Sequence, residues 1–206
     1  MFTGIIEEIG QIVKILPLAV GFRYEIAANK VLQDITPGDS IAVNGVCLTA
    51  VELSQNSFFA DVSPETASRT TLGNLGPQTF INLERAVSLS TRLGGHLVQG
   101  HVDCTGRLLA IDKQSDDFYT LRFSFPSEIS KHLIFKGSIA VDGISLTIAS
   151  LNDDSFEVAI IPKTWNSTNL QYLAVNQKVN LEVDLIAKYV EKLFLAYRGT
   201  SPQDPV

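Results

Sequence analysis

The side chains best suited to chemistry are a thiol and an imidazole that stand in two nearly repeated motifs. Cys47 ends the run VNGVC, and Ser145 takes its place in the matching run VDGIS. His101 lies in the glycine-rich stretch GGHLVQGHVD, and its counterpart near the start of the chain is Ile5. A thiol or hydroxyl can donate hydrogen bonds or attack a carbon, and an imidazole with an ordinary pKa near ~6.5 transfers protons at neutral pH. A lone cysteine is more often an inert small hydrophobe and a lone histidine a satisfied polar group, but the matched positions favour a chemical role.

Other classes of site have no support in the sequence. The chain has 16 Lys and Arg against 22 Asp and Glu, and its net charge of −6 argues against a nucleic-acid partner. Cys104 forms no pair with Cys47 at ligand spacing, and no acidic or thiol residue completes a metal site around His96 and His101. We therefore expect a small-molecule partner, with no metal, no cofactor and no nucleic acid.

These candidate residues belong to a duplicated chain. Ser40–Glu84 aligns without a gap on Ser138–Glu182, and 18 of the 45 positions are identical. The start of the chain, MFTGIIEEIGQIVKI, aligns in the same way on LVQGHVDCTGRLLAI, which begins at Leu97. A repeat of this length is too long for one unit of a solenoid, so it indicates two copies of a domain.

The elements that must position the candidates are mostly strands. Short β-rich runs lie at residues 9–15, 24–27, 40–43, 47–53, 57–62 and 80–84, with counterparts up to 178–183. Asn44-Gly45 and Asp142-Gly143 are strong hairpin signals. About six strands per copy predict a small closed antiparallel barrel, and short helices are expected at Asn29–Ile35 and Ser127–Leu133, each capped by its first residue.

One longer helix is predicted after the second copy. Asp184 can cap it, Gly199 suits its end, and one apolar stripe runs along Ile186, Tyr189, Val190, Leu193, Phe194 and Tyr197. Because both copies are complete before it starts, this stripe covers a barrel or meets another subunit. We expect barrels at residues 1–96 and 97–184, an oligomerisation helix at 185–198 and a disordered tail at 199–206.

The protein is expected to be located in the cytoplasm. No apolar run approaches the ~20 residues that cross a bilayer, and the start MFTGIIEEIG lacks the pattern of a signal peptide. Two cysteines are too few for a disulfide framework, which favours a reducing compartment.

In each copy a strand runs into a proline and a threonine, at Asp61–Thr66 and at Ile160–Trp165. One interpretation is a strand-to-helix corner in which Thr66 or Thr164 caps the helix. The other is a row of backbone N–H and C=O groups, freed from pairing by the proline, that can bind the edge of a flat heterocycle. The residues themselves leave both open.

The opening MFTGI, the central GGHLVQGHVD and the paired VNGVCLT and VDGISLT together resemble the riboflavin synthase family. The resemblance runs from Met1 to about Leu195 and includes the duplication. It implies an all-β fold: two tandem six-stranded antiparallel Greek-key barrels related by internal duplication, plus a C-terminal α-helix. It also implies a homotrimer assembled through that helix, with lumazine synthase as a pathway partner. Each barrel would bind one 6,7-dimethyl-8-ribityllumazine.

The resemblance also implies the site residues. The catalytic set corresponds to Phe2, Ser40, Cys47 and His101. The substrate contacts of the first barrel correspond to Gly4, Ile5, Ile6, Cys47, Leu48, Thr49, Asp61, Val62, Ser63, Pro64, Glu65 and Thr66. Those of the second barrel correspond to Gly100, His101, Val102, Lys136, Ser145, Leu146, Thr147, Ile160, Ile161, Pro162, Lys163, Thr164 and Trp165. One departure is Lys163-Thr164-Trp165, which stands where the first copy has Glu65-Thr66-Ala67.

The implied reaction is a dismutation in which one lumazine gives a four-carbon unit to another, yielding riboflavin and 5-amino-6-(D-ribitylamino)uracil. His101 would transfer protons, and Ser40 and Cys47 would donate hydrogen bonds or shuttle protons. Because His101 aligns with the second copy, we expect the reacting pair to bridge a first barrel and a second barrel of neighbouring subunits.

Two rival interpretations stay open. A lumazine protein of the same family would keep the fold and bind a chromophore without turnover. A flavin-binding oxidoreductase barrel is suggested only by the short Phe22-Arg23-Tyr24-Glu25, a pattern of chance frequency.

Overall fold

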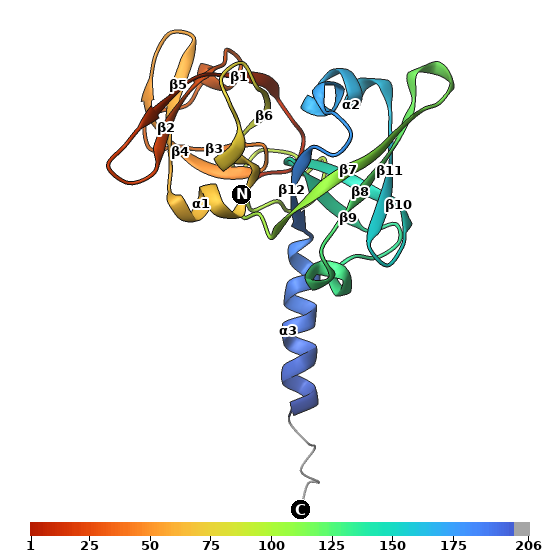
Figure 1. Cartoon of the computed structure of the whole chain (residues 1–206). Helices are drawn as coiled ribbons and strands as arrows, with labels where there is room; N and C mark the ends of the chain where they lie inside the picture. Colours follow the sequence, from red (N-terminus) through yellow and green to blue (C-terminus); the bar gives the residue numbers. More distant parts are fainter. Residues whose placement is uncertain (200–206) are drawn as a thin grey trace, which may run out of the picture.

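A computed structural model describes residues 1–199 and contains two closed six-stranded barrels side by side (Figure 1). The first barrel consists of β1 (Glu8–Pro17), β2 (Phe22–Ala27), β3 (Ser40–Val43), β4 (Val46–Leu53), β5 (Ser57–Val62) and β6 (Phe80–Arg85). The second consists of β7 (Cys104–Lys113), β8 (Tyr119–Ser124), β9 (Ser138–Val141), β10 (Ile144–Leu151), β11 (Ser155–Ile160) and β12 (Lys178–Val183). All strand pairs are antiparallel, and β2 pairs with β5 rather than with β3. The predicted fold is confirmed.

Side-chain alternation explains why these strands close around a core. In β3 and β4, Ile41 and Leu48 are paired and point into the first core, which is filled by branched aliphatic and aromatic residues. Their neighbours in sequence point out of the barrel. The two predicted hairpins are present: Asn44-Gly45 and Asp142-Gly143 all have positive φ, as a tight two-residue turn requires.

Short helical turns connect the strands. They are η1 (Val31–Gln33), α1 (Pro64–Arg69), η2 (Thr71–Asn74), η3 (Ser115–Asp117), η4 (Ser127–His132), α2 (Pro162–Asn166) and η5 (Asn169–Tyr172). Four predicted side-chain caps are wrong. Ser127 does not cap η4 and Thr164 does not cap α2, because these helices follow Pro126 and Ile161 at the N-cap position without a side-chain cap. Asn29 does not cap η1, because the carboxylate of Glu8 binds the N–H groups of Asn29 and Val31 instead. Ser63, not Thr66, caps α1 by accepting the Thr66 N–H at 3.1 Å.

A buried polar network joins the barrels where their hairpins meet. Gly45 and Gly143 face each other, and a Cβ added to Gly45 would lie 2.6 Å from the Gly143 nitrogen. The Asn82 amide donates to the Asp142 carbonyl at 3.0 Å, and the Asn180 amide donates to the Asn44 carbonyl at 2.8 Å. These reciprocal bonds fix the barrels relative to each other about a local twofold axis.

The C-terminal helix α3 (Leu185–Gly199) projects away from both barrels (Figure 1). Asp184 caps it as expected, through a 2.9 Å bond from the Ile186 N–H. At its base Lys188 pairs with Asp103, and Glu191 pairs with Lys131 and His132. The six residues of the apolar stripe (Ile186, Tyr189, Val190, Leu193, Phe194 and Tyr197) are each more than half exposed. Most of the predicted disordered tail, Thr200–Val206, lies outside the described residues.

Candidate functional site

The leading segment of each copy lies against the barrel of the other copy. The Cys47 N–H of the first barrel donates to the Gly100 carbonyl at 2.9 Å. The Ser145 N–H of the second barrel donates to the Gly4 carbonyl at 2.8 Å. Between these contacts, Phe2 of the first leader and Val98 of the second leader are joined by two backbone hydrogen bonds. The two leaders therefore cross between the barrels.

This crossing corrects the way in which the repeat alignment divided the predicted site residues. Gly4, Ile5 and Ile6 were expected beside Cys47, but Ile6 packs against the core of the second barrel. Gly100, His101 and Val102 were expected beside Ser145, but Val102 packs against the core of the first barrel. The alignment matches equivalent residues correctly, but in three dimensions the two groups exchange barrels.

The first site, which we call the Cys47 site, is built on the outer face of β3 and β4. Ser40 pairs with Thr49 and Ala42 with Cys47, so these four side chains share that face. The pairing of β4 with β5 begins at Ala50 and Ala60, so Thr49 and Asp61 are the next residues along each strand. Asp61–Thr66 then turns into α1, and Gly100–Val102 closes the other side. The structure thus brings most of the predicted catalytic set together in one chain.

The second site, which we call the Ser145 site, repeats this geometry on β9 and β10. Ser138 pairs with Thr147 and Ala140 with Ser145. Ile160–Trp165 is the turn into α2, and Gly4–Ile6 takes the place of Gly100–Val102. Lys136, with φ of +65°, donates its N–H to the Ile148 carbonyl, and its ammonium lies 4.9 Å from the centre of the Phe135 ring. Trp165 stacks on Tyr119 at 3.9 Å, so the aromatic residue peculiar to this copy is part of the barrel wall.

Several predicted contacts have side chains that no ligand on the outer face can reach. Leu48, Val62, Leu146 and Ile160 are buried in the two cores. At these positions only backbone groups are available to a ligand. Phe2 is 1% exposed and packs in a small cluster with Ala42, Val98 and Ala140, and its ring lies 2.9 Å from where a Cβ on Gly100 would be. Phe2 therefore supports the Gly100 segment from behind.

His96 is a residue of the Ser145 site that the motifs did not single out. Its Nδ1 lies 2.7 Å from the Ser145 hydroxyl, while its Nε2 is buried without a hydrogen-bond partner. Burial lowers the pKa of His96, opposed by the charge of Asp184, so the ring is neutral at neutral pH. The first copy offers no aligned histidine, which is why comparison of the copies could not find it.

The second cysteine, Cys104, is chemically inert. Burial raises the pKa of its thiol to about 12, so the reactive thiolate does not form at neutral pH.

Two buried carboxylates hold the crossing leaders. Glu84 in β6 accepts hydrogen bonds from the backbone of Thr3 and Gly4, and Glu182 in β12 accepts them from Gln99, Gly100 and His101. Burial raises the pKa of both carboxyls, although these N–H donors oppose the shift. The repeated Asn-Leu-Glu in both copies was the available signal, since an acidic residue inside a strand needs a partner.

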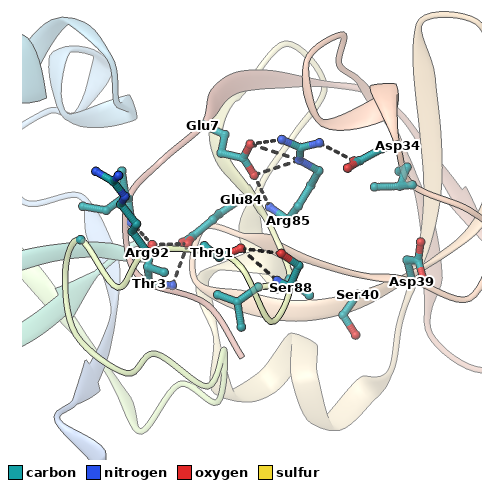
Figure 2. Close-up of a pocket in the computed structure, with 15 residues that line it drawn as sticks. Thr3, Glu7, Asp34, Asp39, Ser40, Glu84, Arg85, Ser88, Thr91 and Arg92 are labelled. Carbon is teal, nitrogen blue, oxygen red and sulfur yellow. Dashed lines mark hydrogen bonds and ion pairs between the residues drawn. The ribbon is translucent and has the colours of Figure 1, made fainter.

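A cavity of about 650 Å³ adjoins the Cys47 site, between β3, β6 and the segment at residues 86–94 (Figure 2). Ser40, Thr3 and Ile5 line it, whereas Cys47 and His101 do not. Arg85 is held on one wall by Glu7 and Asp34, and Thr3 is bonded to Glu84. Because Ser40 also pairs with Thr49, its hydroxyl stands at the border between the cavity and the outer face of β4.

Residues 1–199 contain no cluster of three or more His, Cys, Asp or Glu that could hold a metal ion. In the same part of the chain, no helix is both long and apolar enough to cross a membrane.

Known proteins resemble both the sequence and the fold. A family model described as the lumazine binding domain matches twice, at residues 3–86 and 99–184. The chain is 49% identical over 197 residues to a riboflavin synthase of Mycobacterium tuberculosis, covering 94% of this chain and 98% of that protein. It is 45% identical to the riboflavin synthase of Actinobacillus pleuropneumoniae, covering 98% and 94%.

Solved structures of LumP share the fold. The complex with riboflavin superposes with a TM-score of 0.83 at 25% identity, covering 89% of this chain and 99% of that chain. The complex with 6,7-dimethyl-8-(1'-D-ribityl) lumazine superposes with a TM-score of 0.80 at 26% identity and the same coverage.

Proposed function

Because the chain belongs to the lumazine-binding family, we propose that it is a riboflavin synthase, a transferase acting on two molecules of 6,7-dimethyl-8-ribityllumazine. One molecule gives a four-carbon unit to the other, and the products are riboflavin and 5-amino-6-(D-ribitylamino)uracil. The observation that carries this proposal is the pair of matched sites, each built on one barrel and on the leader of the other copy. A reaction between two identical molecules needs two such sites.

The reaction mainly requires the protein to position the two substrate rings. The 7-methyl group of the lumazine is acidic and its C7 is electrophilic, so the substrates carry their own reactivity. The atoms of two substrates equal those of the two products, and no co-reactant is required. Holding two reactants in the productive orientation can lower a barrier by ~7–11 kcal/mol. The backbone ends of β4–β5 and of β10–β11 would hold the two rings.

The Cys47 site supplies the acid-base groups. His101 transfers the proton to or from the methyl carbon, and Cys47 and Ser40 donate hydrogen bonds to the ring and the ribityl chain. Phe2 fixes Gly100 from behind and so acts by positioning. The Ser145 site binds the second lumazine through Ser145–Thr147, Lys136 and Ile160–Trp165, with Gly4–Ile6 as its far wall.

The two reacting rings come from different subunits. Within one chain the layer of Phe2 and Val98 separates Cys47 from Ser145. The Cys47 site of one subunit would therefore face the Ser145 site of its neighbour. The exposed stripe of α3 supports assembly as a homotrimer, and lumazine synthase in the cytoplasm would supply the substrate.

A lumazine protein is the second candidate, favoured by the likeness to LumP. The higher identity to riboflavin synthases, 49% against 25%, supports the enzyme. The flavin-barrel interpretation loses its one motif, because Arg23 is paired with Asp61 and Glu52 and Tyr24 is buried.

Incubating the purified protein with 6,7-dimethyl-8-ribityllumazine separates the two candidates. We expect one riboflavin and one 5-amino-6-(D-ribitylamino)uracil for every two lumazines consumed, followed by absorbance and chromatography. Bound but unconverted lumazine would identify a carrier and overturn the proposal.

A further inference from the structure

Within residues 1–199, Glu182 is the one side chain that accepts the backbone N–H groups of Gln99, Gly100 and His101. It lies in β12 of the second barrel and is 3% exposed. Its Oε1 accepts the Gln99 N–H at 2.6 Å, and its Oε2 accepts the N–H groups of Gly100 and His101, each at 3.0 Å. Three successive N–H groups thus converge on one carboxylate. Hydrogen bonds to an ionised, buried acceptor are about twice as strong as neutral ones.

The matched residue of the first barrel, Glu84, holds the leader of the first copy in a similar way, but one of its three donors is different. It accepts the N–H groups of Thr3 at 2.7 Å and Gly4 at 3.0 Å, but its third donor is the Thr3 hydroxyl. That hydroxyl in turn accepts the Ile5 N–H at 3.2 Å. Gln99 stands where the first copy has Thr3. Because Gln99 has no hydroxyl, the His101 N–H donates directly to Glu182. Only the second carboxylate therefore holds the residue that bears the imidazole.

The Glu182 contacts also set the position of His101 relative to Cys47. Gly100, with φ of +81°, turns its carbonyl onto the Cys47 N–H, and an added Cβ would lie 2.6 Å from the Cys47 Cβ. The His101 side chain is exposed, and its ring makes no hydrogen bond within residues 1–199. The backbone is then the main means of orienting the imidazole before a substrate binds.

We propose that Glu182 is a positioning residue for the reaction: although it belongs to the second barrel, it holds Gly100 and His101 in register with Cys47 on the first. This inference rests on the proposed function. It assigns to the second copy a part in the chemistry of the first site. Glu84 holds Gly4 at the Ser145 site in the same way, where the structure offers no equivalent imidazole on the leader.

The test compares Glu182→Gln with the matched control Glu84→Gln in the full-length protein. Each substitution keeps the shape of the side chain and replaces one acceptor oxygen with an amide group that cannot accept. We expect hydrogen exchange of the amides at residues 99–101 to rise about 10- to 100-fold in Glu182→Gln, with residues 3–5 unchanged. Glu84→Gln should show the reverse.

Turnover provides the readout that a purely structural role would not give. Glu182→Gln should lower kcat for lumazine conversion by about tenfold or more while KM changes less than about threefold. Glu84→Gln should act mainly on KM. Equal losses of kcat in both variants, or faster exchange at residues 99–101 with an unchanged kcat, would overturn the proposal.

A milder variant keeps the proposal testable if Glu182→Gln does not fold. Gln99→Thr supplies the hydroxyl that the first copy uses, and this hydroxyl competes with the His101 N–H for Glu182. We expect an unchanged Tm and a kcat several-fold lower; an unchanged kcat with the new hydroxyl bonded to Glu182 would contradict the role. If the wild-type protein binds lumazine without converting it, the proposed function fails, and exchange at residues 99–101 still decides whether Glu182 holds this segment.

Discussion

The Cys47 site and the Ser145 site have the same backbone and different side chains. Both use the outer face of a hairpin, a strand that runs into a proline, and the leader of the other copy. The first has a thiol, with an exposed imidazole on its leader. The second has a hydroxyl bonded to a buried, neutral imidazole, His96, which lies before the leader. Under the proposed function, binding is duplicated, whereas proton transfer belongs to one copy.

The largest expected effect comes from separating the two sites of neighbouring subunits. Replacing Val190 and Leu193 with Glu puts two charges in the α3 stripe, where both side chains are more than half exposed. We expect monomers by light scattering and a loss of turnover greater than about 100-fold, because neither site then meets its partner. Lumazine binding to both sites should persist.

Lys192→Glu is the matched control, since it changes the net charge by the same amount on the polar side of α3. It should keep the oligomeric state and the activity of the wild type. A wild-type protein that is already monomeric at micromolar concentration would contradict the proposed assembly.

Substitution of the matched residues tests whether the sites differ in chemistry. Cys47→Ala should lower kcat by about 100-fold or more, the range of a lost acid-base group, while Ser145→Ala should mainly weaken binding. Steady-state kinetics with lumazine measures both. If Cys47→Ala stays near wild-type activity, the thiol only packs against its neighbours and the two sites are equivalent.

Mixing variant subunits sharpens the comparison further. His101 was first expected to complement Cys47 from another subunit, but the structure places both in one site of one chain. Mixing Cys47→Ala with His101→Ala should therefore restore no activity after subunit exchange. Mixing Cys47→Ala with Thr147→Arg, which blocks the Ser145 site, should restore it, because one intact site of each kind remains. Recovery in the first mixture would show that the site is shared differently.

The smallest effect concerns the buried imidazole of the Ser145 site. His96 has a pKa lowered from 6.5 in the folded protein, so below pH 6.5 the unfolded chain binds a proton that the folded chain does not. Stability is then lost as the pH falls, by up to about 1.4 kcal/mol for each pH unit between the two pKa values. The test compares Tm at about pH 7 and about pH 5.5, on either side of the ordinary histidine pKa of 6.5. The Tm of the wild type should fall more over this range than the Tm of His96→Gln. Parallel curves would show that His96 is not held neutral.

The sequence predicted the barrels well because duplication and the hairpin turns are local signals. The pairs Asn44-Gly45 and Asp142-Gly143 leave few other structures open to their strands. The resemblance named candidate site residues, and the structure brings Ser40, Cys47 and the Gly100–Val102 segment together. The sequence could not predict which leader meets which barrel, because Met1–Glu7 and Leu97–Asp103 have no periodic pattern, and their path depends on the distant contact between Phe2 and Val98. His96 was missed because a copy-to-copy comparison detects only residues with counterparts.

The crossing of the two leaders has a consequence for the history of the chain. Each copy completes its site with a segment that starts the other copy, as two protomers do when they exchange arms in a domain-swapped dimer. Each half contains a complete barrel, and its leader packs on the barrel of the other half. A symmetric dimer of single barrels is therefore the natural ancestor, and gene fusion would have tied its two arms into one polypeptide. Once tied, the halves were free to diverge, and a thiol could persist at one site while a hydroxyl took its place at the other.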